Sequence, residues 1–219
     1  MSSTSQERIL EIAAQYKEIF PSLGIHPEEV KMNKKIEGEL EKITELILKN
    51  EHNICAIGEI GLDHHFIKEK DLYPLQKRIF ENMLNIAQDL QLPVNLHTKG
   101  AEKLVFETLP SYNIPNVNMH WYSGPETYLK IGIDRGYYFS ITPAIKYSPA
   151  VKKTATFVEK EYLLLESDGP VKYANETGAP YMIANVLKII SDLKKLDIKE
   201  MEIQIENNTR KIFPKLFSI

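Results

Sequence analysis

The stretch CAIGEIGLD, residues 55 to 63, decides how this chain folds. It is apolar almost throughout, as expected of a strand that is buried on both faces of a parallel sheet, and Glu59 lies near its end. Three further apolar runs also end in a polar side chain. They are PVNLHTK with His97, NVNMHWYSG with His120, and YLLLESDGP with Asp168. Because an α/β barrel gathers the ends of its strands at one rim, we expect these four residues to converge.

Helix-like segments alternate with these runs. Apolar residues recur at helical spacing over residues 36–47 and 75–90, and further helices are predicted near 181–195 and in NTRKIFPKLF, where Asn208 would be the N-cap. Six strands alternating with helices predict right-handed crossovers and a parallel sheet. We therefore predict an α/β fold, a TIM-type (β/α) barrel forming a single domain over residues 1–219. An open doubly wound sheet is the alternative, although GEIGLD is a poor match to a glycine-rich nucleotide turn.

The overall composition narrows the class of protein. The 219 residues are 43% hydrophobic, which is enough for a sizeable core, and the formal net charge is -3. That charge argues against a broadly basic nucleic-acid surface, so any such binding should be directed by a local site. A single cysteine, Cys55, excludes an internal disulfide, and it is expected to be an inert thiol in the core. The start of the sequence has no apolar signal core and the chain has no membrane-length run, so we predict a cytoplasmic protein that does not enter a membrane.

The four strand-end residues suggest metal chemistry. Imidazole and carboxylate groups both bind zinc or manganese, and Glu59, His97, His120 and Asp168 would together supply both ligand types. Any one such residue is more often structural or solvated, but their shared placement favours a common site. The residues alone therefore favour a metal-dependent hydrolase.

An ordered set of motifs resembles the TatD family of metal-dependent deoxyribonucleases. The motifs are GIHPEE at 24–29, GEIGLD at 58–63, LPVNLHTKG at 92–100, HWYSG at 120–124, YYFSI at 137–141, LLLESDGP at 163–170 and NNTRKIF at 207–213. They follow one another in the family's order over nearly the whole chain.

The resemblance implies an amidohydrolase-like TIM barrel that hydrolyses phosphodiester bonds of DNA with a metal-activated water. By matching motif positions, Glu59 corresponds to the glutamate that bridges two metals, and His97 and His120 correspond to ligands of one of them. Asp168 corresponds to a ligand of the other metal that also helps activate the attacking water. The implied cofactor is a divalent metal, Zn, Mg or Mn, with one or two ions per chain, and the implied partner is DNA as substrate.

One family feature is absent from the sequence. Family members begin with a strand that ends in His-x-His, and this chain contains no His-x-His. We therefore expect an incomplete barrel of about six parallel strands, in which the first two family strands are missing because the gene start is misassigned or the barrel is truly shortened. Losing half of a metal pair should reduce the rate. Open strand edges invite pairing, so we expect either a homo-oligomer that covers the open edge of the barrel or a cover built from the N-terminal helix and the loop at 169–180, and we favour the homo-oligomer.

Several residues near the four strand ends could contact substrate. His64 and His65 directly follow GEIGLD and could contact a phosphate or replace a missing metal ligand, although surface imidazoles are an equal alternative. Lys99 could hold a phosphate as a point charge, or it could be a solvated lysine. Trp121 could stack on substrate, although a packed aromatic is the more common role. His26 could approach the site, but it is less favoured as a metal ligand.

Three functions remain open. The first is a metal-dependent deoxyribonuclease of the TatD type with reduced activity. The second is a catalytically impaired barrel that acts as a binding or scaffold protein, and the third is a hydrolase of a small ester or phosphate. The presence of all four candidate ligands argues against the second, because structure alone does not require them together.

Overall fold

The structure is a computed structural model that describes residues 2–217, and these residues form two compact units. The first unit covers the described residues up to Val117 together with those from Phe213 on, and the second covers Asn118–Ile212. The prediction of a single domain over the whole chain is not tested by this division and stays a prediction.

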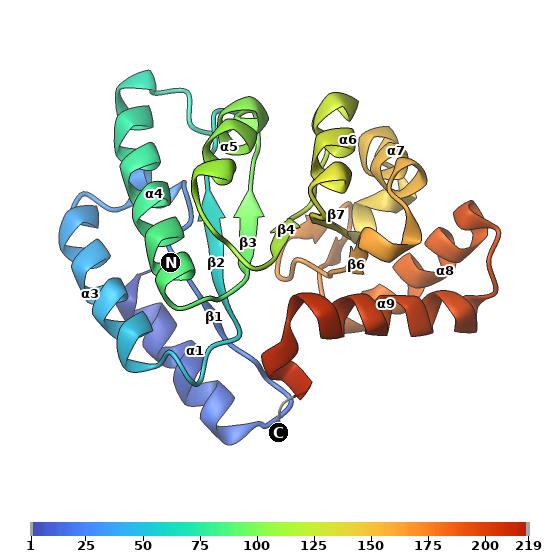
Figure 1. Ribbon diagram of the computed structural model, residues 1–219, viewed down its shortest axis with the longest axis horizontal. Helices are drawn as coiled ribbons and strands as arrows, with labels where there is room; N and C mark the ends of the chain where they lie inside the picture. Colours follow the sequence, from blue (N-terminus) through green and yellow to red (C-terminus); the bar gives the residue numbers. More distant parts are fainter. Residues whose placement is uncertain (1, 218–219) are drawn as a thin grey trace. The chain divides into compact units, whose positions relative to one another are not determined.

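The first unit alternates strands with helices (Figure 1). Its elements are α1 Ser3–Gln15, β1 Ser22–Leu23, α2 Glu29–Met32, α3 Ile36–Lys49, β2 Ala56–Gly61, the 3-10 helix η1 Lys70–Leu72, α4 Tyr73–Asp89, β3 Val94–His97, α5 Glu102–Thr108, η2 Leu109–Ser111 and the C-terminal η6 Pro214–Phe217.

The strands of the first unit are parallel and buried. Leu23 of β1 pairs with Ile57 of β2, and Gly61 at the end of β2 pairs with His97 at the end of β3. The apolar run predicted from CAIGEIGLD is the central strand β2, whose Ile57 and Ile60 side chains are fully buried. This confirms that the run is a strand covered on both faces.

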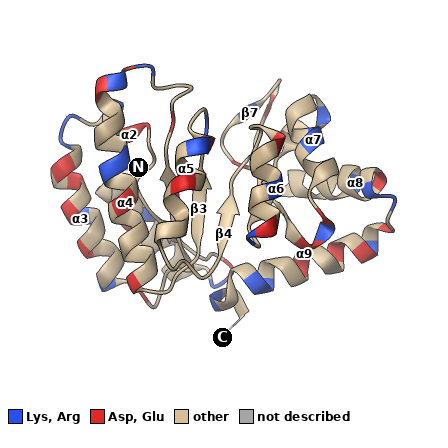
Figure 2. Cartoon of the chain, turned by 45° about the horizontal axis from the view of Figure 1, so that its top comes forward, with Lys and Arg blue, Asp and Glu red and all other residues tan. Residues whose placement is uncertain are grey.

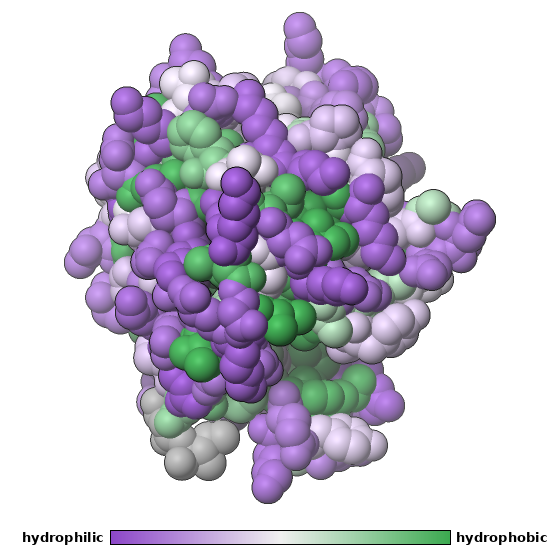
Figure 3. Space-filling view, turned by 90° about the vertical axis from the view of Figure 1, so that its right-hand side faces the viewer, coloured by the Kyte–Doolittle hydropathy of each residue, from purple (hydrophilic) through white to green (hydrophobic). Residues whose placement is uncertain are grey.

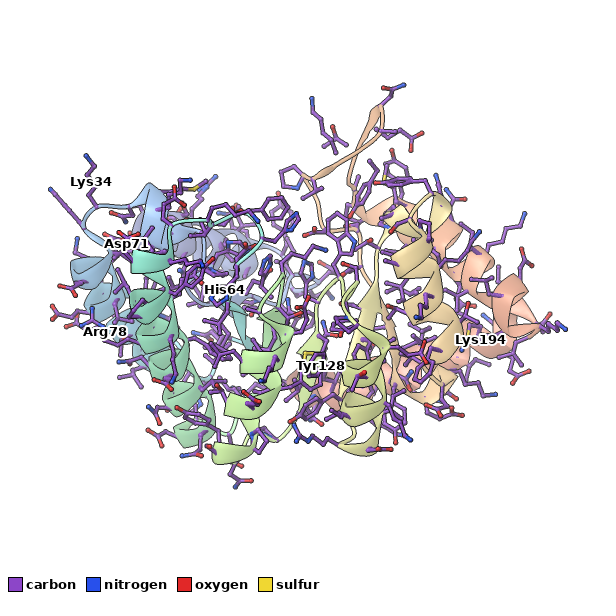
Figure 4. All side chains as sticks on the ribbon, turned by 90° about the horizontal axis from the view of Figure 1, so that it is seen from above. Lys34, His64, Asp71, Arg78, Tyr128 and Lys194 are labelled. Carbon is purple, nitrogen blue, oxygen red and sulfur yellow. The ribbon has the colours of Figure 1, made fainter. Side chains whose placement is uncertain are left out.

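The helices of the first unit cover this sheet through apolar stripes. Helix α3 buries Ile36, Ile43 and Ile47, and α4 buries a stripe that includes Ile79 and Met83. The outer surfaces carry both signs of charge, as Figure 2 shows for α3 and α4. Figure 4 shows Arg78 on the outer side of α4, where its guanidinium forms an ion pair with Glu37 of α3.

Helix α1 packs next to the edge strand β1. The buried Gln6 side chain donates from Nε2 to the backbone oxygen of Gly24, just after β1, over 2.8 Å. A helix that bonds at a strand end in this way covers part of an edge that would otherwise invite pairing. Self-association through an open barrel edge stays a prediction.

The second unit repeats the alternation. Its elements are β4 Val117–Met119, which begins in the first unit, α6 Glu126–Asp134, β5 Tyr138–Ile141, η3 Pro143–Lys146, α7 Pro149–Phe157, η4 Lys160–Tyr162, β6 Leu163–Leu165, the hairpin β7 Lys172–Tyr173 with β8 Glu176–Thr177, η5 Pro180–Met182, α8 Ile183–Lys194 and α9 Ile198–Ile212.

The strands β4, β5 and β6 are also parallel. Met119 pairs with Phe139, and Phe139 pairs with Leu163, and all three side chains are fully buried. With three parallel strands in each unit, the prediction of an α/β fold with about six parallel strands is confirmed.

The last long helix differs from the sequence prediction. Helix α9 begins at Ile198 rather than near Asn208, and the Asp197 carboxylate accepts the backbone N–H groups of Lys199 and Glu200 at its start. The interpretation of Asn208 as an N-cap is therefore wrong, because Asn208 lies fully buried inside the helix. The helix ends at Ile212 because Pro214 disfavours helical geometry in the residue before it.

The outer surface is mixed in character. Figure 3 shows hydrophobic side chains scattered among hydrophilic ones on one face of the molecule. Single exposed apolar residues such as Ile198 and Ile203, at 47% and 51% exposure, are normal on a protein surface. Within residues 2–217, no helix combines the length and apolar character needed to cross a bilayer.

Candidate metal centre

Three side chains of the first unit bring their ligand atoms together. Glu59 lies within β2, His97 ends β3, and His26 follows β1. The Nδ1 atom of His97 lies 2.9 Å from Oε1 of Glu59 and 3.3 Å from Nε2 of His26, which in turn lies 3.4 Å from the same Glu59 oxygen. The parallel register that pairs Gly61 with His97 explains how two distant sequence runs meet here.

These separations fit a divalent metal. Ligand atoms about 2.0 Å from a tetrahedral zinc are separated by roughly 3.3 Å, which is the scale of the three distances measured here. Two imidazoles and one carboxylate are also a known catalytic zinc donor set. His26, however, faces the other two residues with Nε2. To bind a metal through Nε2, a neutral His26 must carry its proton on Nδ1. It would then lose the 3.3 Å hydrogen bond that Nδ1 accepts from the backbone N–H of Glu28. Glu59 and His97 meet no such conflict.

Asp63 stands directly behind His97. Its side chain is fully buried, and Oδ2 lies 2.6 Å from Nε2 of His97. Its other oxygen, Oδ1, accepts backbone N–H groups from His65, Phe66 and Ile67 at 2.8, 2.5 and 3.3 Å. This carboxylate is therefore held on both sides, by the loop after β2 and by the imidazole.

The charges of this pair support one another. Burial opposes ionisation of Asp63, but the hydrogen bonds from His97 and from the Phe66 backbone outweigh it and lower its pKa to about 2. Burial likewise opposes protonation of His97, but hydrogen bonds to Asp63 and then to Glu59 raise the pKa of the imidazole. Asp63 is thus an acceptor, and His97 donates to it.

A buried glutamine fixes the backbone of the same loop. Gln76 of α4 accepts the backbone N–H of Asp63 over 3.2 Å, and it donates to the backbone oxygens of Asp63 and Pro27 over 3.1 and 3.3 Å. Since Pro27 directly follows His26, one side chain ties the end of β2 to the segment that carries His26. The site is therefore held by a helix as well as by the strands.

Gly61 allows β2 and β3 to approach at the site. Its φ is +141°, and a Cβ atom there would lie 2.0 Å from the backbone oxygen of His97. We expect Gly61→Ala to lower the unfolding free energy by about 3 kcal/mol or more, because both the clash and the backbone conformation disfavour a side chain. Urea denaturation measures this. Gly136→Ala is the matched control, since Gly136 has φ +74° with open space around it, and a loss of equal size would show that the close approach is unimportant.

The second unit brings its own histidine and carboxylates together. His120, directly after β4, has a side chain that is 9% exposed, and its Nδ1 lies 2.7 Å from Oε2 of Glu166. The other oxygen of Glu166 accepts the backbone N–H of Trp121 over 2.9 Å. On the opposite side of the ring, Nε2 of His120 lies 3.5 Å from Oδ1 of Asp168. These two atoms form a second pair of possible ligands.

The backbone bends sharply at Asp168 and at Trp121, the residue after His120. Trp121 and Asp168 have φ values of +39° and +43°, in the left-handed region that costs energy for residues other than glycine. Such conformations persist only when the surroundings hold them, and they are common at functional sites. Here the Glu166 bond to the Trp121 backbone is one of the contacts that hold the turn.

The predicted substrate-contacting residues differ in their surroundings. The ring of His64 stacks on Tyr73 with centroids 3.6 Å apart, and burial lowers the pKa of this packed imidazole. Figure 4 shows His64 in the loop that leads to α4. His65 is exposed and Lys99 is half-buried, and the Lys99 backbone oxygen accepts the N–H of His64 over 2.8 Å. Trp121 packs against Tyr173 with ring centroids 5.6 Å apart. A role in substrate binding stays a prediction for all four.

A family model described as TatD related DNase matches residues 1–214 of the sequence. The chain belongs to the TatD-related DNase family. Among its relatives is the uncharacterized metal-dependent hydrolase MJ1582 of Methanocaldococcus jannaschii, which is 32% identical over 210 residues, or 95% of this chain and 80% of that protein. The human deoxyribonuclease TATDN3 is 26% identical over 220 residues, or 96% of this chain and 80% of that protein. These matches confirm the resemblance found in the motifs.

Solved structures of the TatD family share the fold. The crystal structure of the TatD homologue YjjV from Escherichia coli K12 superposes with a TM-score of 0.88 at 22% identity, covering 98% of this chain and 84% of that one. A TatD family hydrolase from Entamoeba histolytica gives a TM-score of 0.84 at 19% identity, covering 97% of this chain and 82% of that one. The TIM-type architecture predicted from the sequence is therefore confirmed at the level of the fold.

The sequence predicted some of the residues that meet at these two sites and missed others. The sequence prediction named Glu59 and His97, which meet in the first unit, and His120 and Asp168, which meet in the second. It did not name Asp63, Glu166 or Gln76. The only sequence signal for the two carboxylates is their position inside GEIGLD and LLLESDGP, beside the residues that were named. That all four predicted ligands form one centre stays a prediction.

Proposed function

We propose that this TatD family member hydrolyses phosphodiester bonds of DNA with divalent metal ions held by Glu59, His97, His120 and Asp168. The observation that carries the proposal is that each unit places a histidine and a carboxylate together at the ends of parallel strands, with ligand atoms 2.9 Å apart for His97 and Glu59 and 3.5 Å apart for His120 and Asp168. The names of several relatives, including the human deoxyribonuclease TATDN3, support DNA as the substrate.

We assign a separate role in the reaction to each of the candidate site residues. A divalent ion, when bound, polarises a phosphoryl oxygen and lowers the pKa of water. Glu59 would hold the ion with a carboxylate oxygen, and Asp168 would accept a proton from the attacking water as a general base. Lys99, His64, His65 and Trp121 are the proposed contacts to the substrate. A lysine near the site would hold a phosphate as a point charge.

DNA would be bound locally rather than over a basic face. The chain carries 27 basic and 30 acidic residues, and Figure 2 shows both signs mixed on the helices. Several of the basic side chains are engaged by nearby acids, as in the pairs Lys77–Glu81 and Lys103–Glu107. Since non-specific affinity for DNA grows with the number of phosphate contacts, affinity should be modest and should depend weakly on salt.

The proposal is tested with purified protein on fluorescent single- and double-stranded DNA. We expect slow cleavage in the presence of Mg²⁺, Mn²⁺ or Zn²⁺ and complete loss of cleavage with excess chelator, because the reaction requires the ion. Metal analysis after exhaustive dialysis should find about one tightly held ion per chain.

The same assay separates the alternatives. Cleavage that survives the chelator would point to a contaminating nuclease. Hydrolysis of a chromogenic phosphomonoester without cleavage of DNA would assign a small phosphate ester as the substrate instead. Metal binding without hydrolysis of either substrate would favour a binding protein.

A further inference from the structure

His97 and His120 each have a carboxylate on the ring nitrogen that faces away from the candidate partner ligand. Asp63 holds Nε2 of His97 at 2.6 Å, and Glu166 holds Nδ1 of His120 at 2.7 Å. We infer that Asp63 and Glu166 are positioning residues that fix His97 and His120 in opposite tautomers, so that His97 offers Nδ1 and His120 offers Nε2 to a metal. The inference deepens the proposed function and rests on it for the metal, but the tautomers can be measured without one.

In the first unit, backbone hydrogen bonds fix the orientation of the Asp63 carboxylate. Its Oδ1 atom accepts three backbone N–H groups, from His65, Phe66 and Ile67, which leaves Oδ2 to face the imidazole. A carboxylate that is ionised can only accept, so the nitrogen that faces it must carry a proton. A neutral His97 then has its lone pair on Nδ1, the atom that lies 2.9 Å from Glu59.

Glu59 is a second acceptor for the imidazole proton of His97, but Asp63 is the stronger acceptor. The Asp63 side chain is fully buried and anchored by the backbone, whereas the Glu59 side chain is 22% exposed and can be solvated. The bond from His97 to Asp63 is also shorter than its contact with Glu59. A short bond between buried partners is the stronger of the two.

In the second unit, the two ring nitrogens of the histidine have exchanged roles: Nδ1 faces the positioning carboxylate and Nε2 faces the candidate ligand. Glu166 uses Oε1 to accept the Trp121 backbone and Oε2 to accept from His120 Nδ1, so both oxygens have defined partners. A neutral His120 then has its lone pair on Nε2. The 3.5 Å from that atom to Asp168 is long for a hydrogen bond but suits two atoms that share an ion.

The opposite tautomers make a sharp experiment possible. In Asp63→Asn the amide oxygen can still accept the three backbone N–H groups, but the amide nitrogen faces His97 and donates to Nε2. The proton of a neutral His97 must then move to Nδ1, the ligand atom. Glu166→Gln has the same effect on His120, because its amide nitrogen would face Nδ1. Both changes preserve side-chain size, remove the negative charge and replace the acceptor that faces the ring by a donor.

Matched controls are available in each unit. Glu39 accepts the backbone N–H of Ser3 and Asp197 accepts those of Lys199 and Glu200, so both are carboxylates that hold a backbone without contacting a histidine ring. Glu39→Gln and Asp197→Asn therefore remove a similar charge and a similar bond. They should leave the tautomers and the metal affinity unchanged.

The first readout is the tautomer of each ring in ¹⁵N-labelled, metal-free protein at a pH above imidazole titration. Long-range ¹H–¹⁵N spectra should show the proton on Nε2 of His97 and on Nδ1 of His120, and both assignments should reverse in the matching amide variant. The second readout is zinc affinity by competition with a chromophoric chelator. We expect each amide variant to bind its zinc at least about tenfold more weakly.

The outcomes are distinct. Wild-type protein with the proton on Nδ1 of His97 or on Nε2 of His120 would overturn the inference, even if a variant fails to fold. Folded amide variants that keep the wild-type tautomers, or that bind zinc within about twofold of wild type, would also overturn it and leave the carboxylates with a structural role only. Correct tautomers in a protein that binds none of Zn²⁺, Mn²⁺ and Mg²⁺ would support the assignment of the tautomers and refute the proposed function.

Discussion

His97→Ala is expected to lower the affinity for a divalent metal at least about 100-fold and to abolish any hydrolysis. The change removes one of two adjacent ligand atoms and leaves the ionised Asp63 without its imidazole partner. The fold should survive, because Asp63 keeps three backbone donors and the lost ring lies at a strand end, so we expect a loss of only about 1 to 2 kcal/mol in unfolding free energy. Zinc competition, the DNA assay and urea denaturation measure the three quantities.

The matched control is His52→Ala. His52 lies in the same unit, but its side chain is 90% exposed, so its removal should change neither metal affinity nor activity. The assignment of His97 as a ligand would be refuted by a His97→Ala protein that is folded and retains its zinc. A large loss of stability in this variant would instead show that the imidazole is needed to compensate the buried Asp63 charge.

The sequence allowed prediction of the strand ends because two simple patterns coincide there. Runs such as CAIGEI are apolar without alternation, which is typical of strands buried on both faces, and a polar residue such as Glu59 stands out at the end of such a run. Parallel pairing then places His97 beside Glu59, as the register of β2 and β3 shows. In the second unit β5 lies between β4 and β6, so direct strand pairing does not bring His120 and Asp168 together; their closeness reflects the gathering of parallel strand ends at one edge.

The positioning residues could not be predicted in this way. Asp63 and Glu166 act through contacts with His97 and His120, which are 34 and 46 residues away along the chain. Nothing in the local pattern distinguishes Asp63 from an acid that ends a strand in solvent. Its role depends on the turn that directs three backbone N–H groups toward one of its oxygens, and that turn exists only in the folded unit.

Asn208 is a further residue whose role could not be predicted from the local sequence. Asparagine is one of the residues favoured at the start of a helix, and Asn208 was predicted to be the N-cap of the last helix. In the structure the helix already extends over ten residues before it, and the Asn208 side chain points inward. Helix α9 buries a stripe formed by Met201, Asn208 and Ile212, so Asn208 belongs to the packed face of the helix.

Asn208→Ala is expected to lower the unfolding free energy by about 2 to 4 kcal/mol. The Asn208 amide nitrogen donates to the backbone oxygens of Lys160 and Leu163 over 2.7 and 2.8 Å, and its oxygen accepts from Gln204 over 2.8 Å. Alanine would remove a donor from each of these carbonyls next to a fully buried position; the Lys160 oxygen would keep the Leu163 N–H, but the loss of these bonds and the cavity left by the amide both destabilise the fold. Urea denaturation and hydrogen exchange of the β6 amides measure the effect.

The consequence should reach the candidate site of the second unit. Leu163 begins β6, and the chain continues from this strand to Glu166 and Asp168, so loosening its start should raise exchange in β6 before global unfolding. Asn207→Ala is the matched control, because Asn207 is exposed on the same helix and alanine favours helix, so its stability should change by less than about 0.5 kcal/mol. Equal losses in the two variants would show that helix propensity, and not the buried amide, governs this position. A loss confined to Asn208→Ala would show that the buried Asn208 amide helps α9 to hold β6, which leads to the carboxylates that face His120.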